Sequence, residues 1–527
     1  MQNVNLSAIF FPRTVSLRKF QDMSQQVRVR FAPSPTGPLH IGGVRTALFN
    51  YLFAKKHGGV FYLRIEDTDQ NRFVPGAEAY IMEALEWLGI PPDETVGKNE
   101  KFGPYRQSER KEIYREYAER LIATGDAYYA FDTAESLDAL RKAAEEKGGA
   151  FIYNHESRKN LDNSLNLPES DLKRRLESGE DYVIRFKTPE NETLELHDII
   201  RGDIKFDTNL LDDKVLFKSD GMPTYHLANI VDDHLMETSH VIRGEEWLPS
   251  LPLHAMLYRA FGWTPPQFAH LPLILKPVGN GKLSKRDGDK LGFPVFPLDW
   301  KGADGTSPGY REAGFLPEAV INFLALLGWN DGTEKEIFTL DELVSAFDLS
   351  RVHKAGAKFD PVKNRTFNHQ HLIRKSDRDL AEAFLPILKA HGIEPAPQYV
   401  ERVVSLIKER AYFVGDFWEL GSYFFNAPMT YDEKASKNWK PETGPLMEKV
   451  SAVLTQIEGF TSMTIESTLK NWMETEGIGM GKVMQPLRLS LVGALQGPHL
   501  FDIAEMIGKD ETLRRIATAV NHFTHKE

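Results

Sequence analysis

The sequence predicts an α/β protein built on a doubly wound parallel sheet, with an inserted α/β domain and an all-helical C-terminal region. Three observations lead to this fold class. Strand-like and helix-like segments alternate near the N-terminus, a mixed and charged stretch interrupts them, and helical periodicity dominates beyond about residue 315. The alternation begins with a strand-like run at 27–31, a helix after Gly43 and a buried strand at 59–65. This order is typical of the βαβ unit that opens a doubly wound sheet.

The later elements follow the same reasoning. Residues 106–212 have a mixed pattern, which indicates an inserted domain, and their clearest helix is at 110–124. Strand-like runs at 215–218 and 240–243 are expected to resume the parallel sheet. An apolar helix at 251–261 is expected to pack beside it, and further helices are predicted at 316–327, 380–390, 399–410 and 500–507.

Composition limits the classes of function. The 527 residues are enough for several domains with their own cores, and no apolar run is long enough to span a membrane. The chain has no cysteine, which excludes disulfides, thiolate zinc sites and cysteine nucleophiles and fits a reducing compartment. The net charge of -11 opposes indiscriminate binding to polyanions, although a local basic face can still bind nucleic acid.

Residues 1–26 differ from the rest of the chain. Arg13 and Arg18 precede the first acidic residue, Asp22, so the composition loosely resembles an organelle transit peptide. That interpretation would place the protein in the mitochondrial matrix. We favour a start assigned too early, with Met23 as the natural start of a bacterial cytoplasmic protein.

A turn rich in proline and glycine, residues 33–43, connects the first strand to the first helix. A helix that opens in this way presents free backbone N–H groups, where an anionic phosphate is favoured. His40 adds an imidazole beside Gly42 and Gly43, which let a ligand approach the backbone. The turn therefore predicts a nucleotide site.

Residues 66–69 (Glu-Asp-Thr-Asp) fall where the second strand ends. Ligands of doubly wound sheets lie at the carboxyl ends of the strands, so this motif and the first turn should face one pocket. Asp67 and Asp69 suggest either a carboxylate metal site or a structural role in capping the next turn.

A basic loop at 282–286 (Lys-Leu-Ser-Lys-Arg) lies between glycines. Three cations and a hydroxyl group on such a loop can close over a triphosphate, where charge develops during phosphate displacement. An isolated run of this kind is more often a solvated surface loop.

The pairing of His-Ile-Gly-Gly with Lys-Leu-Ser-Lys-Arg, on either side of an inserted domain, resembles the class I aminoacyl-tRNA synthetases. The resemblance is closest to the glutamyl-tRNA synthetases of bacterial and organellar type and extends from Val27 over nearly the whole chain. The segments that carry it are 30–37, 63–69, 103–110, 217–228 and 243–248.

The resemblance implies a fold and a domain order. The sheet would be Rossmann-like. The implied segments are a leader or mis-assigned start at 1–26, the catalytic domain in two halves at 27–105 and 213–314, an acceptor-stem-binding domain at 106–212, a stem-contact domain at 315–370 and a helical anticodon-binding region of two subdomains at 371–527.

The resemblance also implies an activity. Members join ATP and L-glutamate into glutamyl-adenylate and pyrophosphate, and then pass the glutamyl group to the terminal ribose of tRNA(Glu). Mg²⁺ accompanies the ATP, and members generally need tRNA before they activate glutamate. We therefore expect a monomer that binds ATP, glutamate and tRNA(Glu), with no membrane partner.

Free glutamate brings an ammonium group and two carboxylates, so its pocket needs both signs of charge. Matched to the family, Arg30 and Arg243 hold the substrate acid, with Arg243 on the side-chain carboxylate, and Glu66 meets the ammonium group. The same match adds Ala32, Ser34, Tyr225, Asn229 and Trp247. The alternatives are an ordinary ion pair of Arg243 with Glu245 or Glu246, and core positions for the two aromatic residues.

The ATP site follows from the same match. His40 and Gly42 are expected against the nucleotide, with Glu246 and the backbone near Leu235 around the adenosine. Ser284 and Lys285 are expected on the phosphates, and His40, Lys282 and Lys285 are the catalytic residues. No general base is needed, because the attacking carboxylate is already ionised at neutral pH.

The sequence fits four other functions less well than it fits a glutamyl-tRNA synthetase. Glutaminyl-tRNA synthetases usually have His in place of Gly43, Asp in place of Glu66 and a neutral residue in place of Arg243. A buried arginine facing a neutral amide would lose its counter-charge, so Arg243 favours glutamate. The short glutamyl-queuosine tRNA enzyme and a small-molecule nucleotidylyltransferase lack the long helical C-terminal third. A non-catalytic tRNA-binding paralogue would lack His40, Lys285 or Arg243.

The chain departs from the family pattern at three places. Residues 129–132 stand where some relatives have zinc-binding cysteines, so no structural zinc is expected. The stretch 287–312 is longer than usual, and its apolar part at 293–298 is either a lid-side hairpin or a lineage-specific surface. Residues 359–368 keep the family's acid, lysine and final asparagine but lose the usual leucine and tryptophan.

Anticodon reading is expected in the helical C-terminal third, because single-stranded bases are recognised by stacking and by hydrogen bonds to their edges. The candidates are Lys408, Arg410, Tyr412, Phe413 and Phe417. A helix of this kind also needs aromatic residues for its core. The sequence leaves open whether tRNA(Gln) is charged as well.

Overall fold

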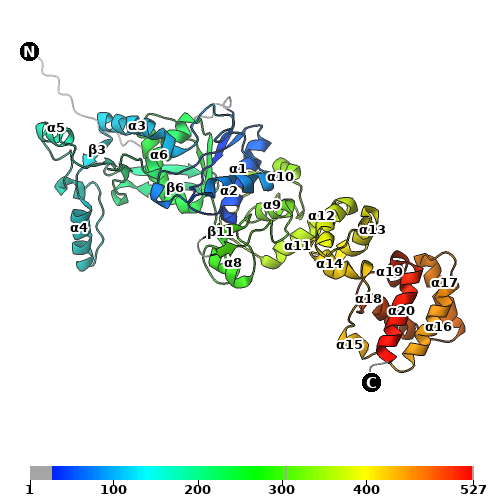
Figure 1. The fold of residues 1–527 in the computed structure, drawn as a ribbon. Coiled ribbons are helices and arrows are strands. Elements are labelled where there is room, and N and C mark those ends of the chain that lie inside the picture. The colour runs from blue at the N-terminus through cyan, green and yellow to red at the C-terminus, as the bar shows by residue number, and fades with distance from the viewer. Residues whose placement is uncertain (1–25, 303–304, 525–527) are drawn as a thin grey trace, which may run out of the picture. The chain divides into compact units, whose positions relative to one another are not determined.

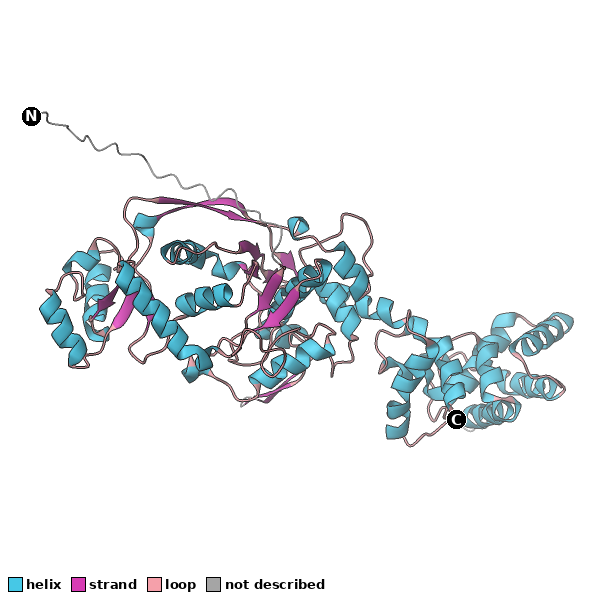
Figure 2. Ribbon diagram, turned by 90° about the horizontal axis from the view of Figure 1, so that it is seen from above, coloured by secondary structure: helices cyan, strands magenta, loops and turns pink. Residues whose placement is uncertain are grey.

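The computed structural model describes residues 26–302 and 305–524. The described chain forms two compact units. The first contains the residues up to Ala313 together with Val320–Pro361, and the second contains Gly314–Ala319 and the residues from Val362 onward. Figure 1 labels the elements of both, and Figure 2 shows helices and no strands in the described part of the second unit. The predicted leader at 1–26 falls almost wholly outside the described residues. The finer domain boundaries remain predictions.

The first unit opens with the predicted βαβ unit. Strands β1 (Arg28–Phe31) and β2 (Val60–Leu63) pair in parallel, and α1 (Ile41–Lys56) connects them. Strand β2 is a short apolar run, whereas β1 alternates Arg28 and Arg30 with apolar residues. The side chains of both strands are almost all buried, which is typical of a sheet covered on both faces. The prediction for residues 27–65 is confirmed.

A second parallel pair lies beside the first. Strands β8 (His240–Gly244) and β9 (Gln267–Leu271) are parallel, and α7 (Leu251–Ala260) connects them. The backbone N–H of Ser239 donates to the carbonyl of Arg28 at 2.9 Å, so the start of β8 lies next to β1. The carboxyl ends of β1, β2, β8 and β9 therefore meet at one edge.

The inserted region supplies a hairpin to the sheet that contains β8 and β9. Strand β5 (Thr193–Asp198) pairs antiparallel with β6 (Gly202–Asp207), and Asp198 also lies opposite Phe268 of β9 in parallel register. A hairpin from the inserted region thus extends the catalytic sheet. This contact brings Asp198 to the carboxyl-end edge where the site forms.

The prediction that residues 215–218 resume the parallel sheet is wrong. Strand β7 (Val215–Phe217) pairs antiparallel with β4 (Val183–Phe186), which pairs antiparallel with β3 (Ala127–Ala130). These strands form a separate three-stranded sheet. A three-residue apolar strand looks the same in either sheet, because its hydrophobicity shows that it is buried and not which strand it pairs with.

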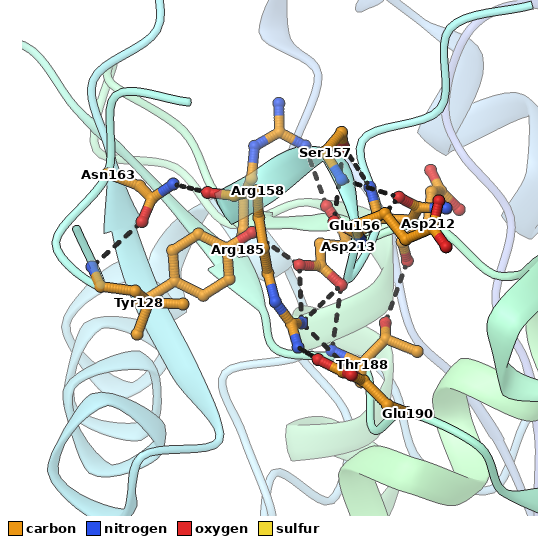
Figure 3. Close-up of polar contacts among 12 residues, drawn as sticks. Tyr128, Glu156, Ser157, Arg158, Asn163, Arg185, Thr188, Glu190, Asp212 and Asp213 are labelled. Carbon is orange, nitrogen blue, oxygen red and sulfur yellow. Dashed lines mark hydrogen bonds and ion pairs between the residues drawn. The ribbon is translucent and has the colours of Figure 1, made fainter. Parts of the chain in front are cut away.

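Asp213 is the centre of a buried group of hydrogen bonds beside this small sheet (Figure 3). Its carboxylate accepts hydrogen bonds from the Tyr128 hydroxyl at 2.6 Å, from the backbone N–H of Thr188 at 3.0 Å and from Arg158 at 3.0 Å. Arg185 donates to its carbonyl at 2.8 Å. Because Asp213 is fully buried, these donors replace the water that its charge would otherwise need.

The remaining elements of the first unit are mostly helices. Helix α3 confirms the prediction at 110–124. The bounds are α2 (Ala77–Trp87), α3 (Lys111–Thr124), α4 (Ala134–Glu146), α5 (Glu169–Glu177), α6 (Tyr225–Leu235), α8 (Lys285–Leu291) and α10 (Leu340–Ala346), with the short strands β10 (Ile274–Leu275), β11 (Trp300–Gly302), β12 (Gly305–Ser307) and β13 (Ala357–Lys358). Helix α9 (Pro317–Ala325), whose residues up to Ala319 belong to the second unit, falls within the predicted helix at 316–327.

The long stretch at 287–312 differs from both alternatives. Residues 293–298 are neither a hairpin nor a surface, because Phe293, Val295, Phe296 and Leu298 are all buried. The carbonyl of Val295 accepts from the backbone N–H of Ile41 at 2.9 Å, which ties this segment to the start of α1. The hairpin is instead β11–β12, which follows it.

The second unit has a helical core of its own. Its helices are α11 (Pro361–Leu372, whose first residue belongs to the first unit), α12 (Asp377–Ala390), α13 (Pro397–Ile407), α14 (Asp416–Gly421), α15 (Glu433–Ser436), α16 (Thr443–Thr455), α17 (Ser462–Thr475), α18 (Met480–Val492), α19 (Leu500–Ile507) and α20 (Lys509–Thr524). Apolar residues from these helices, such as Phe384, Val403 and Leu487, are fully buried in one cluster. The predicted helices at 380–390, 399–410 and 500–507 are confirmed. Within the described ranges, no helix combines the length and the apolar character needed to cross a membrane.

Candidate active site

A cavity of about 380 Å³ lies at the carboxyl ends of the parallel strands. Arg30 and Phe31 end β1, Arg243 and Gly244 end β8, and Leu273 follows β9. This is where ligands of doubly wound sheets bind. The predicted site residues that line the cavity are Arg30, Ala32, Ser34, His40, Gly42, Glu66, Tyr225, Asn229, Arg243, Glu246, Trp247 and Lys282.

Three predicted ATP-site residues do not line this cavity. Leu235 ends α6 and packs against the hydrophobic core. Ser284 caps α8, and its hydroxyl donates to Asp287 at 2.6 Å. Lys285 lines a second cavity of about 730 Å³, which shares Ser34 and His40 with the first. The basic loop therefore borders two adjoining spaces.

His40 caps the N-terminus of α1 with its own side chain. Its Nδ1 accepts a hydrogen bond from the backbone N–H of Gly42 at 3.1 Å, so in the neutral ring the proton is on Nε2. Burial is the main cause that lowers the pKa of His40 to about 4, and the charge of Lys282 lowers it further. Nε2 is buried and has no partner among the residues that the structure describes. It is a donor available to a ligand.

This capping changes the predicted phosphate contact. The first N–H groups of α1 are not free, because Ile41 donates to the carbonyl of Val295 at 2.9 Å, and Gly42 and Gly43 donate to His40. The donor offered to an anion is instead the imidazole Nε2–H. The glycine at position 43 has a packing role, since an added Cβ would lie 2.7 Å from a side-chain carbon of Leu39.

Buried histidines should make the stability of the protein depend on pH. Burial is the main cause that lowers the pKa of His40, His226 and His240 to about 4. Between the usual value near 6.5 and about 4, the unfolded chain binds protons that the folded chain does not. The stability is therefore complete above about pH 6.5 and is lost as the pH falls toward 4, by up to about 1.4 kcal/mol per pH unit for each ring.

Urea unfolding at about pH 7 and about pH 5 measures this effect. The free energy of unfolding should be lower at the acidic pH, and the loss should be smaller in His240→Gln, which removes one ring at the start of β8. Equal stability at the two pH values in the wild-type protein would contradict the assignment of these histidines as neutral.

Arg30 is already neutralised by a carboxylate. Its Nε and Nη2 donate to the two oxygens of Asp233 at 3.0 and 3.1 Å, and Arg64 donates to the same carboxylate at 2.8 Å. Burial alone would raise the pKa of Asp233, but the two arginine charges outweigh it and lower that pKa. Arg30 can therefore donate to a ligand but does not carry an uncompensated charge.

The Glu66 carboxylate belongs to the same group of charged residues as Arg30, Arg64 and Asp233. Its Oε1 accepts from Arg64 at 3.0 Å and from the Asn229 amide at 3.3 Å. Burial raises the pKa of Glu66, and the charge of Arg64 opposes that shift. A cationic ligand group beside it would favour the ionised carboxylate.

Arg243 differs from Arg30 because its partners are neutral. Its side chain is only 5% exposed. Nε donates to His270 at 3.0 Å, and Nη1 donates to the Tyr225 hydroxyl at 2.8 Å and faces Nδ1 of His254 at 3.3 Å. Among the described residues no carboxylate pairs with it. A buried guanidinium with no counter-charge is a strong site for an anion.

The alternative ion pairs are not formed. Glu245 pairs with Arg201 at 2.5 Å and accepts from the backbone N–H of Leu273 at 2.8 Å, and Glu246 pairs with Lys282 at 2.8 Å. Burial alone would raise the pKa of Glu246, but the hydrogen bond from Lys282 and other contributions lower it. Both carboxylates therefore pair with other residues, and Arg243 can still form an ion pair with a ligand.

The two aromatic residues line the cavity instead of the core. The rings of Tyr225 and Trp247 lie 4.3 Å apart between centroids, and Trp247 is 41% exposed. The Tyr225 hydroxyl accepts from Arg243, as described above. Together the two residues form a wall that orients the guanidinium toward the cavity.

The carboxylates at the end of β2 have structural roles. Asp67 accepts from the backbone N–H and the hydroxyl of Ser108 at 2.8 and 2.6 Å, and Asp69 pairs with Arg72 at 2.7 Å. In the described part of the chain, no group of three or more potential ligand residues is close enough to hold a metal ion. These contacts favour a structural role over a metal site. The predicted capping of the next turn is not seen, because Asp69 makes no side-chain capping hydrogen bond at Gln70–Arg72 and Asp67 instead binds Ser108.

Sequence reasoning missed part of the cavity wall. Leu273 and Ile274 line it directly after β9. The signal was available, since the carboxyl end of every strand in the sheet is a candidate ligand contact. Lys301 on the β11 strand lines the second cavity beside Lys285 and was also missed.

The anticodon candidates have mixed environments within the second unit. Tyr412 is 41% exposed, and Arg365 lies over its ring at 5.0 Å. Lys408 pairs with Asp377 at 2.7 Å. Phe417 is fully buried in the helical core, so the suggestion that it stacks on a base is wrong. An aromatic residue at helical spacing fits either role, and only burial separates them.

Comparisons with known proteins agree with this geometry. Residues 26–364 match the family described as tRNA synthetases class I (E and Q), catalytic domain, and residues 379–520 match the anticodon binding domain. A glutamate–tRNA ligase from Flavobacterium johnsoniae is 72% identical over 95% of this chain and 100% of its own length. One from Porphyromonas gingivalis is 56% identical over 94% of this chain and 99% of its own length.

A solved structure is similar over the same extent. It is a glutamate tRNA ligase from Elizabethkingia meningosepticum in complex with its amino acid, 54% identical, with a TM-score of 0.92 over 94% of this chain and 99% of that one. The similarity covers both units of the fold.

Proposed function

The chain belongs to the class I tRNA synthetases (E and Q), and from this we infer that it is a glutamate–tRNA ligase. It activates L-glutamate with ATP and transfers the glutamyl group to the 3′ end of its tRNA: ATP + L-glutamate + tRNA(Glu) gives AMP + diphosphate + L-glutamyl-tRNA(Glu). The observation that carries the amino-acid specificity is the buried guanidinium of Arg243, whose partners are all neutral.

The two arginines of the cavity, Arg30 and Arg243, differ in how strongly they can bind an anion. Arg30 forms an ion pair with Asp233, so its positive charge is already neutralised and attracts an anion only weakly. Arg243 has no carboxylate partner among the described residues, so the γ-carboxylate of glutamate would form an ion pair with it in a site shielded from water. Glutamine offers only a neutral amide, which leaves the buried charge uncompensated. We therefore assign the side-chain carboxylate of glutamate to Arg243 and its ammonium group to Glu66.

The ATP contacts follow from the donors around the two cavities. His40 lines both cavities, and its Nε2–H is a donor without a partner among the described residues. Lys282 and Lys285 supply positive charge from the basic loop. Glutamate's α-carboxylate attacks the α-phosphorus, pyrophosphate leaves, and these donors stabilise the charge that develops in the transition state. No side chain has to remove a proton in this step.

Mg²⁺ is proposed to accompany the nucleotide. Within the described ranges, no group of three or more potential ligand residues is available to bind it. The phosphates of ATP would supply the oxygen ligands that Mg²⁺ prefers. Zinc is not part of the proposal.

The tRNA-binding regions are proposed by residue range. The inserted region at 106–212 would contact the acceptor stem, and residues 315–370 would contact the stem further along. The helical region at 371–527, which overlaps the match to the anticodon binding domain, would read the anticodon, with Lys408 and Arg410 as candidates. We further propose a monomer in the bacterial cytoplasm.

Aminoacylation of defined tRNAs tests the function. Purified protein should charge tRNA(Glu) with labelled glutamate in an ATP-dependent reaction and should not charge any tRNA with glutamine. Adding tRNA(Gln) with glutamate decides whether the enzyme also accepts that tRNA. Charging of tRNA(Gln) with glutamine would contradict the proposed function.

A further inference from the structure

A buried chain of hydrogen bonds leads from Asp198 to Arg243. Asp198 and His270 are both fully buried, and His270 Nδ1 lies 2.6 Å from the Asp198 carboxylate. On the other side of the ring, Nε2 accepts from Arg243 Nε at 3.0 Å. The hydrogen bonds join the end of β5, strand β9 and the end of β8, and of the three residues only Arg243 lines the glutamate cavity.

The two contacts determine the tautomer of His270. A carboxylate can only accept, so Nδ1 carries the proton, and Arg243 can only donate, so Nε2 carries none. Burial lowers the pKa of His270, and the hydrogen bond to Asp198 opposes that shift. The neutral ring fits this assignment, because a doubly protonated ring would present a donor to the guanidinium.

We propose that His270 is a positioning residue that aims Arg243 at the side-chain carboxylate of glutamate, with Asp198 holding its tautomer. This inference rests on the proposed function. An arginine side chain has many rotamers, and ordering it before the substrate arrives reduces the entropy lost on binding. The contact to His270 uses the inner nitrogen, Nε. Nη1 already donates to Tyr225 at 2.8 Å, whereas the contact of Nη2, to the Trp247 carbonyl, is long at 3.4 Å, so Nη2 is the nitrogen best able to donate to the ligand.

Asp198 is a poor variant for testing this. Its carboxylate also accepts from the backbone N–H groups of Ile200 and Arg201 at 2.9 and 2.8 Å, so its replacement disturbs the loop after β5. His270 allows a matched pair. The amide of an asparagine occupies the place of Nδ1 and can still donate to Asp198. The amide of a glutamine reaches the place of Nε2 and can accept from Arg243.

The experiment compares the KM values for glutamate and ATP in the full-length wild type, His270→Asn and His270→Gln, by aminoacylation of tRNA(Glu). His270→Asn should raise the KM for glutamate roughly tenfold or more, because it loses a hydrogen bond to a charged group. The KM for ATP should stay within about twofold, and His270→Gln should recover most of the affinity for glutamate. A purely structural role would raise both KM values together.

Two outcomes would overturn the inference. One is a wild-type KM for glutamate in His270→Asn, and the other is equal loss of glutamate and ATP affinity in both variants. If neither variant folds, ¹⁵N spectra of the wild type labelled at histidine decide, because a protonated Nε2 on His270 at neutral pH excludes the proposed contact. Failure of the proposed function is separate, since it would appear as no glutamate charging by the wild type.

Discussion

Replacing Lys285 with alanine is expected to slow the formation of glutamyl-adenylate by about 10²- to 10³-fold, the usual effect of removing one preorganised donor from a transition state. Lys285 is the first residue of α8 and lines the cavity that shares His40 with the glutamate pocket. It has no partner among the described residues, so its charge is free to follow the phosphates. The KM for glutamate should change by less than about twofold, because Lys285 does not line the glutamate cavity.

Rapid-quench measurement of adenylate formation, at saturating glutamate and tRNA, gives the rate directly. Lys290→Ala is the matched control, because it removes an exposed cation from the same helix without altering either cavity. A Lys285→Ala enzyme that forms adenylate at the wild-type rate would show that the basic loop does not act on the phosphates.

Replacing Arg243 with glutamine is expected to raise the KM for glutamate by about 10²- to 10³-fold, since the loss of one partner of a desolvated charge pair costs about 2–5 kcal/mol. The glutamine side chain keeps much of the arginine's length but carries no charge. The KM for ATP should stay nearly unchanged, and the preference for glutamate over glutamine should fall by a similar factor. Steady-state aminoacylation with each amino acid measures both quantities.

Arg259→Ala serves as the control for this variant, because it removes an exposed arginine on the neighbouring helix α7. Equal loss of glutamate affinity in Lys285→Ala and Arg243→Gln would contradict the division of labour between the phosphate loop and the glutamate pocket. An unchanged preference for glutamate in Arg243→Gln would do the same.

The parts of the fold that were predictable depend on local patterns. The βαβ opening follows from a strand-like run at 27–31 and an apolar run at 60–63, separated by a helical segment. Helices α12 and α19 follow from apolar residues at helical spacing. In these elements, neighbours within a few positions in the sequence carry the information, whereas Arg243 was a site candidate through its match to the family.

The parts that were not predictable depend on partners far apart in the sequence. Strand β7 is apolar in either sheet, and only its pairing with β4 decides which one it joins. The Asp198 carboxylate and the His270 ring are 72 positions apart, and one sequence gives no signal that they meet. Whether the amide of Gly42 is free depends on the rotamer of His40, which requires the three-dimensional structure.

The most direct test of the account is ATP–pyrophosphate exchange, run with glutamate and with glutamine in the presence and absence of tRNA. The geometry of Arg243 predicts exchange that depends on glutamate, and the tRNA requirement of similar enzymes predicts that tRNA must be present. Glutamine should support no exchange above background. Exchange with glutamine but not with glutamate would contradict the central claim that the buried charge of Arg243 selects the amino acid.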